Sequence, residues 1–192
     1  MSRICIIVGH AQRGTFCEAL AEAYMHGACT AGHQARLFVL SRMTFDPILH
    51  EGFSKEQPLE PDLKDAQDAI GWADHLVIVF PLWLGTLPAI LKGFLERVLQ
   101  PRFAFQSDAS MSGYKPLLTG KSARVIISMG MPATVYRLYF GAHALKMLKR
   151  NILNFVGIRP VRATLFGMVG ASTPDKRRYW LAQVQQLGHD AA

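Results

Sequence analysis

The first eighteen residues constrain the fold more than any other part of the chain. Residues 4–8 form an unbroken apolar run that ends at Gly9, and helical periodicity begins at Thr15. A strand that is apolar at every position is typical of a parallel sheet with helices on both faces, because neither face of such a strand meets water. Thr15, followed three residues later by Glu18, matches the capping-box pattern of a helix N-terminus. The chain is therefore expected to begin with a strand and a helix of an α/β protein.

The same alternation continues along the chain. Further strands are expected at residues 35–40, 76–80, 124–128 and 161–166, and further helices at about 62–73, 88–99, within 138–155, and from Thr173 onward. Residues 106–121 between them are polar and contain glycine. Strands that alternate with helices imply right-handed crossovers and a three-layer α/β sandwich. A length of 192 residues predicts one domain, residues 1–192.

Neither a membrane segment nor a secretory signal is expected. The longest apolar run, residues 76–91, is interrupted by two prolines and a glycine, whereas a spanning helix needs about 20 apolar residues. The N-terminus runs directly into the first strand without a signal-peptide pattern, which predicts a cytoplasmic protein. The three cysteines share no C-x-x-C spacing and have no clustered histidines, so neither disulfides nor a metal site is expected.

Positive charge is concentrated in the second half of the chain. Residues 1–108 contain nine Lys and Arg against twelve Asp and Glu, whereas residues 109–178 contain twelve Lys and Arg against Asp175 alone. This asymmetry indicates a phosphate-bearing or acidic partner. Nucleic acid is not the expected partner, because the sequence has no RNP, helix-turn-helix or zinc-finger pattern.

Three loops are the expected place for function. Open parallel sheets bind ligands beyond the carboxyl ends of their strands, which here means residues 9–17, 81–86 and 128–136. The first loop leads into a helix, where unpaired N–H groups and the helix dipole attract an anion. It lacks both G-x-G-x-x-G and a Walker Lys-Ser/Thr, which argues against a Rossmann dinucleotide site and an NTPase. We interpret it as a phosphate-binding loop, and a plain helix cap at Thr15 is the alternative.

The other two loops carry side chains suited to an aromatic ligand. Trp83 offers a large apolar face in a loop with an irregular backbone, although it could instead pack beneath the loop. Gly130 either lets the backbone approach a ligand closely or marks an ordinary turn. His10 either donates to a phosphate or lies exposed at the end of its strand, and Tyr136 and His143 could supply protons near neutral pH.

Four segments together resemble a known family. They are residues 9–17, 43–48, 81–83 and 88–98, of which the last, Pro-Ala-Ile-Leu-Lys-Gly-Phe-Leu-Glu-Arg-Val, is the most specific. The chain strongly resembles the flavodoxin-like NAD(P)H:quinone oxidoreductases, best over residues 3–105. The resemblance implies a flavodoxin-like fold whose five-stranded parallel sheet has the order 2-1-3-4-5.

The resemblance also implies the site residues. The flavin phosphate would be surrounded by His10, Gly14, Thr15, Phe16 and Cys17. The isoalloxazine ring would contact Pro81, Leu82, Trp83 and Leu84 from one loop, and Ser128, Met129, Gly130 and Met131 from another. The proton donors beside the flavin would be Tyr136 and His143. Cys17 stands where the family often has Asn, and His143 lies one residue beyond the family's spacing from the tyrosine.

The function implied is that of a homodimeric flavoenzyme. NADPH or NADH would give a hydride to FMN, or alternatively FAD, and a quinone-like acceptor would then take two electrons at the same ring face. The alternative within the family is a flavin-binding regulatory subunit of a partner such as a potassium efflux system, bound at a membrane without insertion. A one-electron carrier of the true flavodoxin kind is disfavoured, because those proteins tend to be strongly acidic and this chain is basic.

Overall fold

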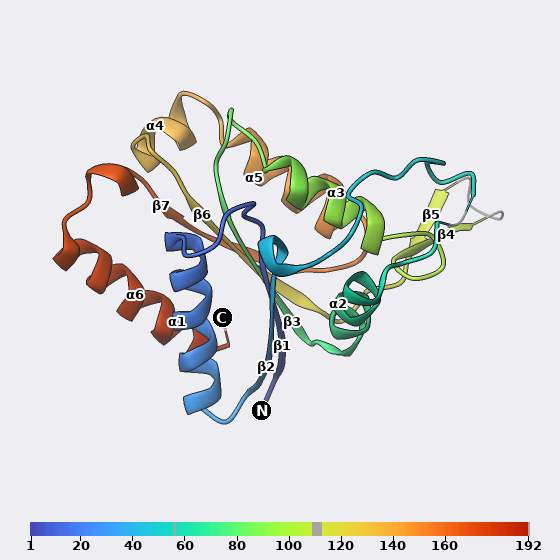
Figure 1. Cartoon of the computed structure of the whole chain (residues 1–192), viewed down its shortest axis with the longest axis horizontal. Coiled ribbons are helices and arrows are strands. Elements are labelled where there is room, and N and C mark those ends of the chain that lie inside the picture. The colour runs from blue at the N-terminus through green and yellow to red at the C-terminus, as the bar shows by residue number, and fades with distance from the viewer. Residues whose placement is uncertain (56, 109–112, 192) are drawn as a thin grey trace.

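A computed structural model of the protein describes residues 1–55, 57–108 and 113–191. Five strands form one parallel sheet in the order β2-β1-β3-β6-β7, which confirms the expected order when the strands are counted within the sheet. Their bounds are β1 (Arg3–Val8), β2 (Gln34–Val39), β3 (His75–Pro81), β6 (Ser122–Ser128) and β7 (Val161–Phe166). Figure 1 shows the sheet crossing the molecule with helices on both of its faces.

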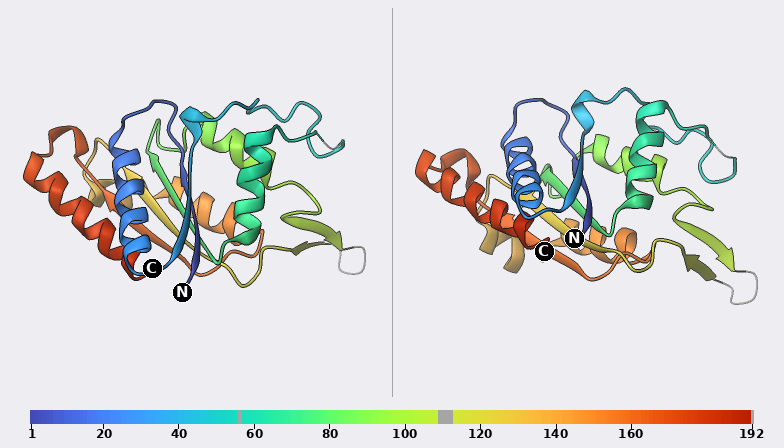
Figure 2. Two further views of the ribbon diagram at one scale, coloured as in Figure 1. Left: turned by 60° about the horizontal axis from the view of Figure 1, so that its bottom comes forward. Right: turned by 90° about the horizontal axis from the view of Figure 1, so that it is seen from below.

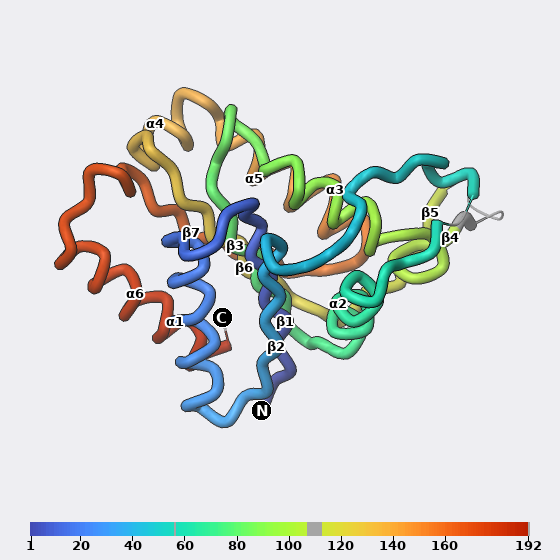
Figure 3. Tube along the Cα trace, viewed as in Figure 1, coloured from blue at the N-terminus to red at the C-terminus, as the bar shows by residue number. Residues whose placement is uncertain are grey.

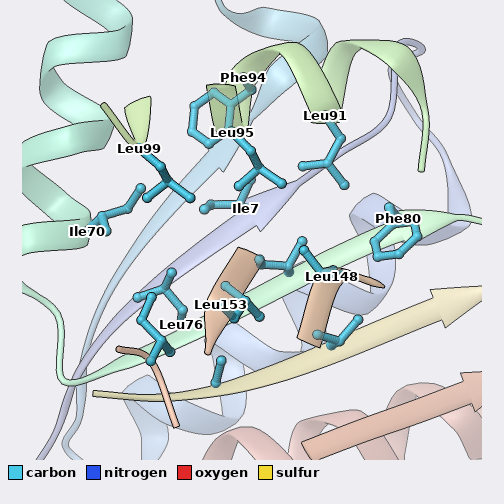
Figure 4. Close-up of a cluster of buried hydrophobic side chains, with 14 of the residues drawn as sticks. Ile7, Ile70, Leu76, Phe80, Leu91, Phe94, Leu95, Leu99, Leu148 and Leu153 are labelled. Carbon is cyan, nitrogen blue, oxygen red and sulfur yellow. The ribbon is translucent and has the colours of Figure 1, made fainter. Parts of the chain in front are cut away.

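Each face of the sheet has its own apolar core. On one face, α1 (Phe16–Thr30) and α6 (Pro174–His189) cover alternate residues of β1 and β3, such as Ile6 and Val79. On the other face, α2 (Pro61–Trp72), α3 (Ala89–Val98), α5 (His143–Met147) and the π-helical turn η2 (Leu148–Leu153) cover the remaining strand residues. Figure 4 shows this second core, in which Ile7 and Phe80 of the sheet lie among leucines of α3 and η2. The uninterrupted apolar runs of the sequence follow from this double coverage.

Two glycines allow α1 and α6 to pack closely. A Cβ atom at Gly27 would lie 1.9 Å from the carbonyl oxygen of Gln185, and one at Gly188 would lie 2.0 Å from that of Tyr24. Neither position can accept a side chain, because the atoms that it would strike belong to the backbone of the facing helix.

The connection from β2 to α2 is anchored on α3 by a buried arginine. Arg97 is fully buried, and its guanidinium donates to a carboxylate oxygen of Glu60 at 2.8 Å, to the carbonyl of Pro58 at 2.8 Å and to the carbonyl of Asp46. Two of the segments that carry the family resemblance, residues 43–48 and 88–98, therefore touch one another. Figure 3 shows this connection passing α3 after the short helix η1 (Leu40–Arg42).

The structure differs from the expectation in two places. A hairpin, β4 (Phe105–Asp108) with β5 (Gly113–Pro116), lies in the segment expected to be a polar loop. The helix expected within residues 138–155 is present as α5 followed directly by η2, but a further short helix that was not expected, α4 (Ala133–Leu138), precedes it after a break. The break follows from Gly141 and Ala142, whose positive φ angles of 61° and 51° are incompatible with a continuous right-handed helix. Among the described residues, no helix is long and apolar enough to cross a membrane.

The buried His75 makes the stability of this fold depend on pH. Burial, then the charges of Arg124 and Arg162, lower the pKa of His75 to about 4. Its pKa in the unfolded chain is about 6.5, so the unfolded state binds the proton more tightly and the fold loses stability as pH falls from 6.5 towards 4. The expected loss from this residue is about 3 kcal/mol.

His75→Phe, which keeps a flat ring against Tyr24, is expected to remove most of this pH dependence. Urea unfolding of both proteins across that pH range, in a buffer without phosphate, measures how steeply the free energy of unfolding changes with pH. His26→Phe, at an exposed position, is the control and keeps the wild-type slope. If the free energy of unfolding falls equally with pH in the wild type and in His75→Phe, the pH dependence does not come from His75.

Candidate functional site

The carboxyl ends of β1, β3 and β6 bring three loops together. The ladder of strand hydrogen bonds continues one residue beyond the strands: the Gly9 N–H donates to the Val79 carbonyl at 2.8 Å, and the Leu82 N–H donates to the Ser128 carbonyl at 2.8 Å. The Met129 N–H donates to the Phe166 carbonyl at 2.9 Å. Loops 9–15, 82–88 and 129–132 therefore leave the sheet from one edge, as expected for ligand binding in an open parallel sheet.

The first loop ends in a capped helix. The Thr15 hydroxyl accepts from the Glu18 N–H at 3.4 Å, which confirms Thr15 as the N-cap of α1. The N–H groups of Phe16 and Cys17 lie in the first helical turn, where no carbonyl of the same helix can accept from them. Gly14 has a φ of 66°, so a residue without a Cβ suits the turn that precedes the cap. An anion at this helix end would gain both hydrogen bonds and the helix dipole.

A carboxylate already lies beside these donors. Glu18 is 3% exposed, and its side chain accepts from the Gly14 N–H at 2.8 Å and forms an ion pair with Arg42 of η1. Arg13 also binds η1, through the carbonyl of Ser41 at 3.2 Å. The ion pair offsets the negative charge of Glu18, and the two arginines fix the first loop to the end of β2. In the sequence, Glu18 is recognisable only as a capping residue, and Arg42 carries no signal because its pairing depends on the fold.

His10 is buried beneath the second loop rather than exposed at the end of its strand. Its Nδ1 accepts from the Gln12 N–H at 2.9 Å, and its ring meets the Trp83 ring edge-on with 5.0 Å between centroids. Burial lowers the pKa of His10, so the imidazole is neutral at pH 7 and carries its proton on Nε2. His10 is thus a neutral donor that connects the first loop to the second.

The second loop is a tight turn with an apolar tip. Trp83 and Thr86 exchange backbone hydrogen bonds at 3.1 and 2.9 Å, and Leu84 and Gly85 between them have φ angles of 47° and 78°. A positive φ is uncommon for leucine and carries a conformational cost. Trp83 is 41% exposed and the Leu84 side chain is fully exposed, so these apolar groups lie on the surface rather than beneath the loop. An exposed apolar tip beside buried donors suits a flat ligand.

The third loop is joined to the first by two side chains. The Cys17 thiol and the Ser128 hydroxyl lie 3.2 Å apart, and both residues are buried. The Met129 N–H is used by Phe166, whereas the N–H groups of Gly130 and Met131 have no backbone partner among the described residues. Gly130 and Met131 are therefore the residues of this loop whose backbone can donate to a ligand. A Cβ atom added at the exposed Gly130 would meet no other atom within 4 Å, so open space borders the loop there.

The two expected proton donors are placed differently. Tyr136 of α4 is 1% exposed, its hydroxyl accepts from the Leu145 N–H at 3.1 Å, and burial raises its pKa. His143 is an exposed residue at the start of α5. No hydrogen bond or ring contact joins His143 to the three loops within the part of the chain that the structure describes.

The arrangement can hold a ligand with an anionic and a flat aromatic part. The anion would lie at the start of α1, and the ring between the Trp83 turn and the Gly130 backbone. The three loops were expected from the sequence to form one site, and the contacts His10–Trp83 and Cys17–Ser128 bring them together. Pro81 and Leu82 contribute through their place at the end of β3, where Pro81 is buried and Leu82 partly buried.

Comparison with known proteins gives consistent results. The family described as having a flavodoxin-like fold matches residues 2–187. NAD(P)H dehydrogenase [quinone] 1 of Cavia porcellus is 31% identical over 208 residues, covering 95% of this chain and 74% of that protein. An FMN-dependent NADH:quinone oxidoreductase of Nitratidesulfovibrio vulgaris is 30% identical over 103 residues, covering 54% of this chain and 48% of that protein. The solved NAD(P)H:quinone oxidoreductase of Methanothermobacter marburgensis superposes with a TM-score of 0.79 at 25% identity, covering 100% of this chain and 99% of the other.

The burial of Cys17 predicts an unreactive thiol at this site. Burial raises its pKa to about 11, against the opposing effect of the Ser128 hydroxyl, and burial raises the pKa of Cys5 to about 12. At pH 8 roughly one Cys17 in a thousand is a thiolate. Cys29 is exposed, so the native protein is expected to show one fast-reacting thiol with an aromatic disulfide reagent, and Cys29→Ser to show none. A fast thiol that persists in Cys29→Ser and disappears in Cys17→Ser would contradict this account.

Proposed function

Because the chain belongs to the flavodoxin-like family of NAD(P)H dehydrogenases, we propose that it is an FMN-dependent enzyme that reduces quinone-like acceptors with NADPH or NADH. The observation that carries the proposal is the convergence of the α1 N-terminus, the Trp83 turn and the Gly130 backbone at one edge of the sheet. We also propose a cytoplasmic location, which the three free cysteines support.

The first loop fits a flavin phosphate. The N–H groups of Thr15, Phe16 and Cys17 are directed out of the start of α1, and the neutral His10 offers an Nε2–H donor at the same edge. Glu18 would repel a phosphate if its charge stood alone, but its ion pair with Arg42 and its bond from Gly14 spread that charge. Cys17 would contribute its backbone N–H, since its thiol faces Ser128.

The second and third loops fit the flavin ring. Trp83 and Leu84 would cover one part of the ring with apolar surface, and Pro81 and Leu82 would shape the floor beside it. The N–H groups of Gly130 and Met131 would donate to the pyrimidine side of the ring, where negative charge develops on reduction. FMN requires nothing beyond these three loops, and for this reason we propose FMN rather than FAD.

Bound flavin supplies two-electron chemistry, in which it accepts a hydride from the nicotinamide and passes two electrons to the acceptor. The residues of the chain bind and orient both substrates in turn at the open side of the Trp83 turn, so the nicotinamide must leave before the acceptor binds. A shared position of this kind gives ping-pong kinetics. Tyr136 is the proposed proton donor, since its hydroxyl accepts from Leu145 and keeps its own proton for donation. We retain His143 as a second proton donor, at the exposed start of the next helix.

We further propose that the enzyme is a homodimer. An apolar groove of about 300 Å³ between α3, η2 and the β4–β5 hairpin is lined by aromatic residues, and a second hollow of about 660 Å³ adjoins it at Phe53. Ile48, Phe53 and Tyr114 in this region are 57–62% exposed, which is a large apolar surface for an isolated subunit. The rim carries the oppositely charged pair Lys92 and Glu96, so a second copy related by a two-fold axis would meet complementary charge.

The phosphate site is tested by Thr15→Glu. A carboxylate at the N-cap would repel the flavin phosphate and fill the space it needs, so FMN affinity is expected to fall at least about 100-fold, measured by quenching of FMN fluorescence. Thr173→Glu is the matched control, because Thr173 caps α6 in the same way and is not a residue of the three loops. Equal FMN affinity in the two variants would contradict the phosphate site and with it the proposed function.

The role of Tyr136 is tested by Tyr136→Phe. Loss of a proton donor is expected to lower kcat at least about tenfold while FMN affinity changes less than about twofold. The melting temperature is measured alongside, because the same hydroxyl also accepts from the Leu145 N–H. Unchanged turnover with a lower melting temperature would assign Tyr136 to stability instead of catalysis.

The dimer is tested by Ile48→Glu. A charge at this exposed apolar position is expected to give a monomer at micromolar concentration by light scattering, whereas the wild type gives a dimer. Tyr179→Glu, on the exposed side of α6, is the control and is expected to leave the mass unchanged. A monomeric wild-type protein would contradict the proposed assembly.

A further inference from the structure

A polar pocket lies at the edge of the sheet opposite the three loops proposed to bind flavin. It has a volume of about 280 Å³ and is lined by His75, Ser122, Ala123, Pro160, Arg162 and Ala191. These residues come from the amino ends of β3, β6 and β7 and from the end of α6. Figure 2 shows this edge at the foot of the sheet, where the N- and C-terminal ends of the chain lie close together. Nothing in the proposed redox function uses this pocket.

His75 and Ser122 leave one hydrogen-bond donor unused. They are neighbours in the register of β3 and β6, and His75 Nδ1 lies 2.7 Å from the Ser122 hydroxyl. A neutral imidazole and a hydroxyl each have one proton that they can donate in a hydrogen bond, and the bond between them uses only one of these two protons. In either tautomer a donor therefore remains, on His75 Nε2 or on the Ser122 oxygen. His75 is 4% exposed, and its Nε2 has no partner among the described residues. A buried donor without an acceptor carries a cost that a ligand would remove.

The charge around the pocket is positive. Arg162 lines it, and Arg124 lies beside Arg162 in the register of β6 and β7, where its guanidinium donates to the Thr164 hydroxyl at 2.7 Å. Burial, and after it the charges of both arginines, lower the pKa of His75.

Among the described residues, the carboxylates that adjoin the pocket in the sequence are already bound by other side chains. Asp74 is bound by Arg3 at 2.7 Å, and Oδ1 of Asp190 is near Gln186 and His189 at 3.0 and 3.1 Å. The C-terminal end of α6 contributes about half a negative charge, less than the full positive charge of Arg162, which lines the pocket.

We propose that this pocket is a binding site for a small oxyanion, a phosphate or a carboxylate. The Arg162 guanidinium would form charge-assisted hydrogen bonds with two oxygens of the ion. The unused donor of the His75–Ser122 pair would form a further hydrogen bond with the same ion. The field of Arg124 would add to its affinity. The ligand would be either the free ion or an anionic group of a metabolite small enough for the pocket.

The test is a titration of the full chain with inorganic phosphate, and separately with acetate, followed by nitrogen-15 NMR of the His75 ring. This signal is local to the pocket, so the result is independent of phosphate binding at α1 and of the flavin proposal. We expect a saturable shift of the His75 resonances with at least one of the two ions, and the ion that binds more tightly identifies the class of ligand. Arg162→Gln is expected to weaken that binding at least about tenfold, and Arg178→Gln, which removes the same charge from the exposed start of α6, less than about twofold.

Three results would overturn the proposal. The first is the absence of a saturable shift with either ion. The second is equal weakening by both arginine variants, which would show only a general charge effect. The third is binding that appears only in a chain shortened by residues 191–192, because the C-terminal residues would then occupy the pocket themselves.

Discussion

The structure depends on the common register of β1, β3 and β6. These three strands are paired in parallel without a bulge, and their last hydrogen bonds join Gly9 to Val79 and Leu82 to Ser128. Because β3 and β6 end together at Pro81 and Ser128, and β1 ends two residues before that level, the residues that follow the three strands leave the sheet as adjacent loops. A slip of one residue would turn each buried side chain to the opposite face, so the two apolar cores fix the register and, through it, the position of the loops.

Electrostatic balance at the start of α1 is the second condition for the site. A buried carboxylate, Glu18, stands beside the donors proposed to bind a phosphate, and it is tolerated because Gly14 and Arg42 satisfy it. Glu18 thereby holds the turn in shape and leaves the N–H groups of Phe16 and Cys17 directed outward. The opposite edge of the sheet is different, since Arg162 and the buried His75 line a pocket there and no carboxylate of the described residues lines it.

The parts of this molecule that follow from local chemistry could be predicted from the sequence. The apolar runs indicated the strands, Thr15 and Glu18 marked the start of α1, and Thr173 and Pro174 marked the start of α6. The break between α4 and α5 could not be predicted, because Ala142 takes a left-handed conformation that only its surroundings impose. The β4–β5 hairpin was missed because its strands have four residues each and no apolar alternation. The partners of Glu18, Cys17 and His75 come from distant strands and helices, so no local pattern indicates Arg42, Ser128 or the pocket beside Arg162.

The most direct test of the account is to follow the two half-reactions separately. The purified protein, loaded with FMN and kept free of oxygen, is mixed with NADPH or NADH in a stopped-flow instrument, and the flavin absorbance is recorded before a quinone is added. The account predicts that the absorbance is lost on mixing with the nicotinamide alone and returns when the quinone is added. A protein that binds no FMN, or whose bound FMN is reduced only when the quinone is also present, would contradict it.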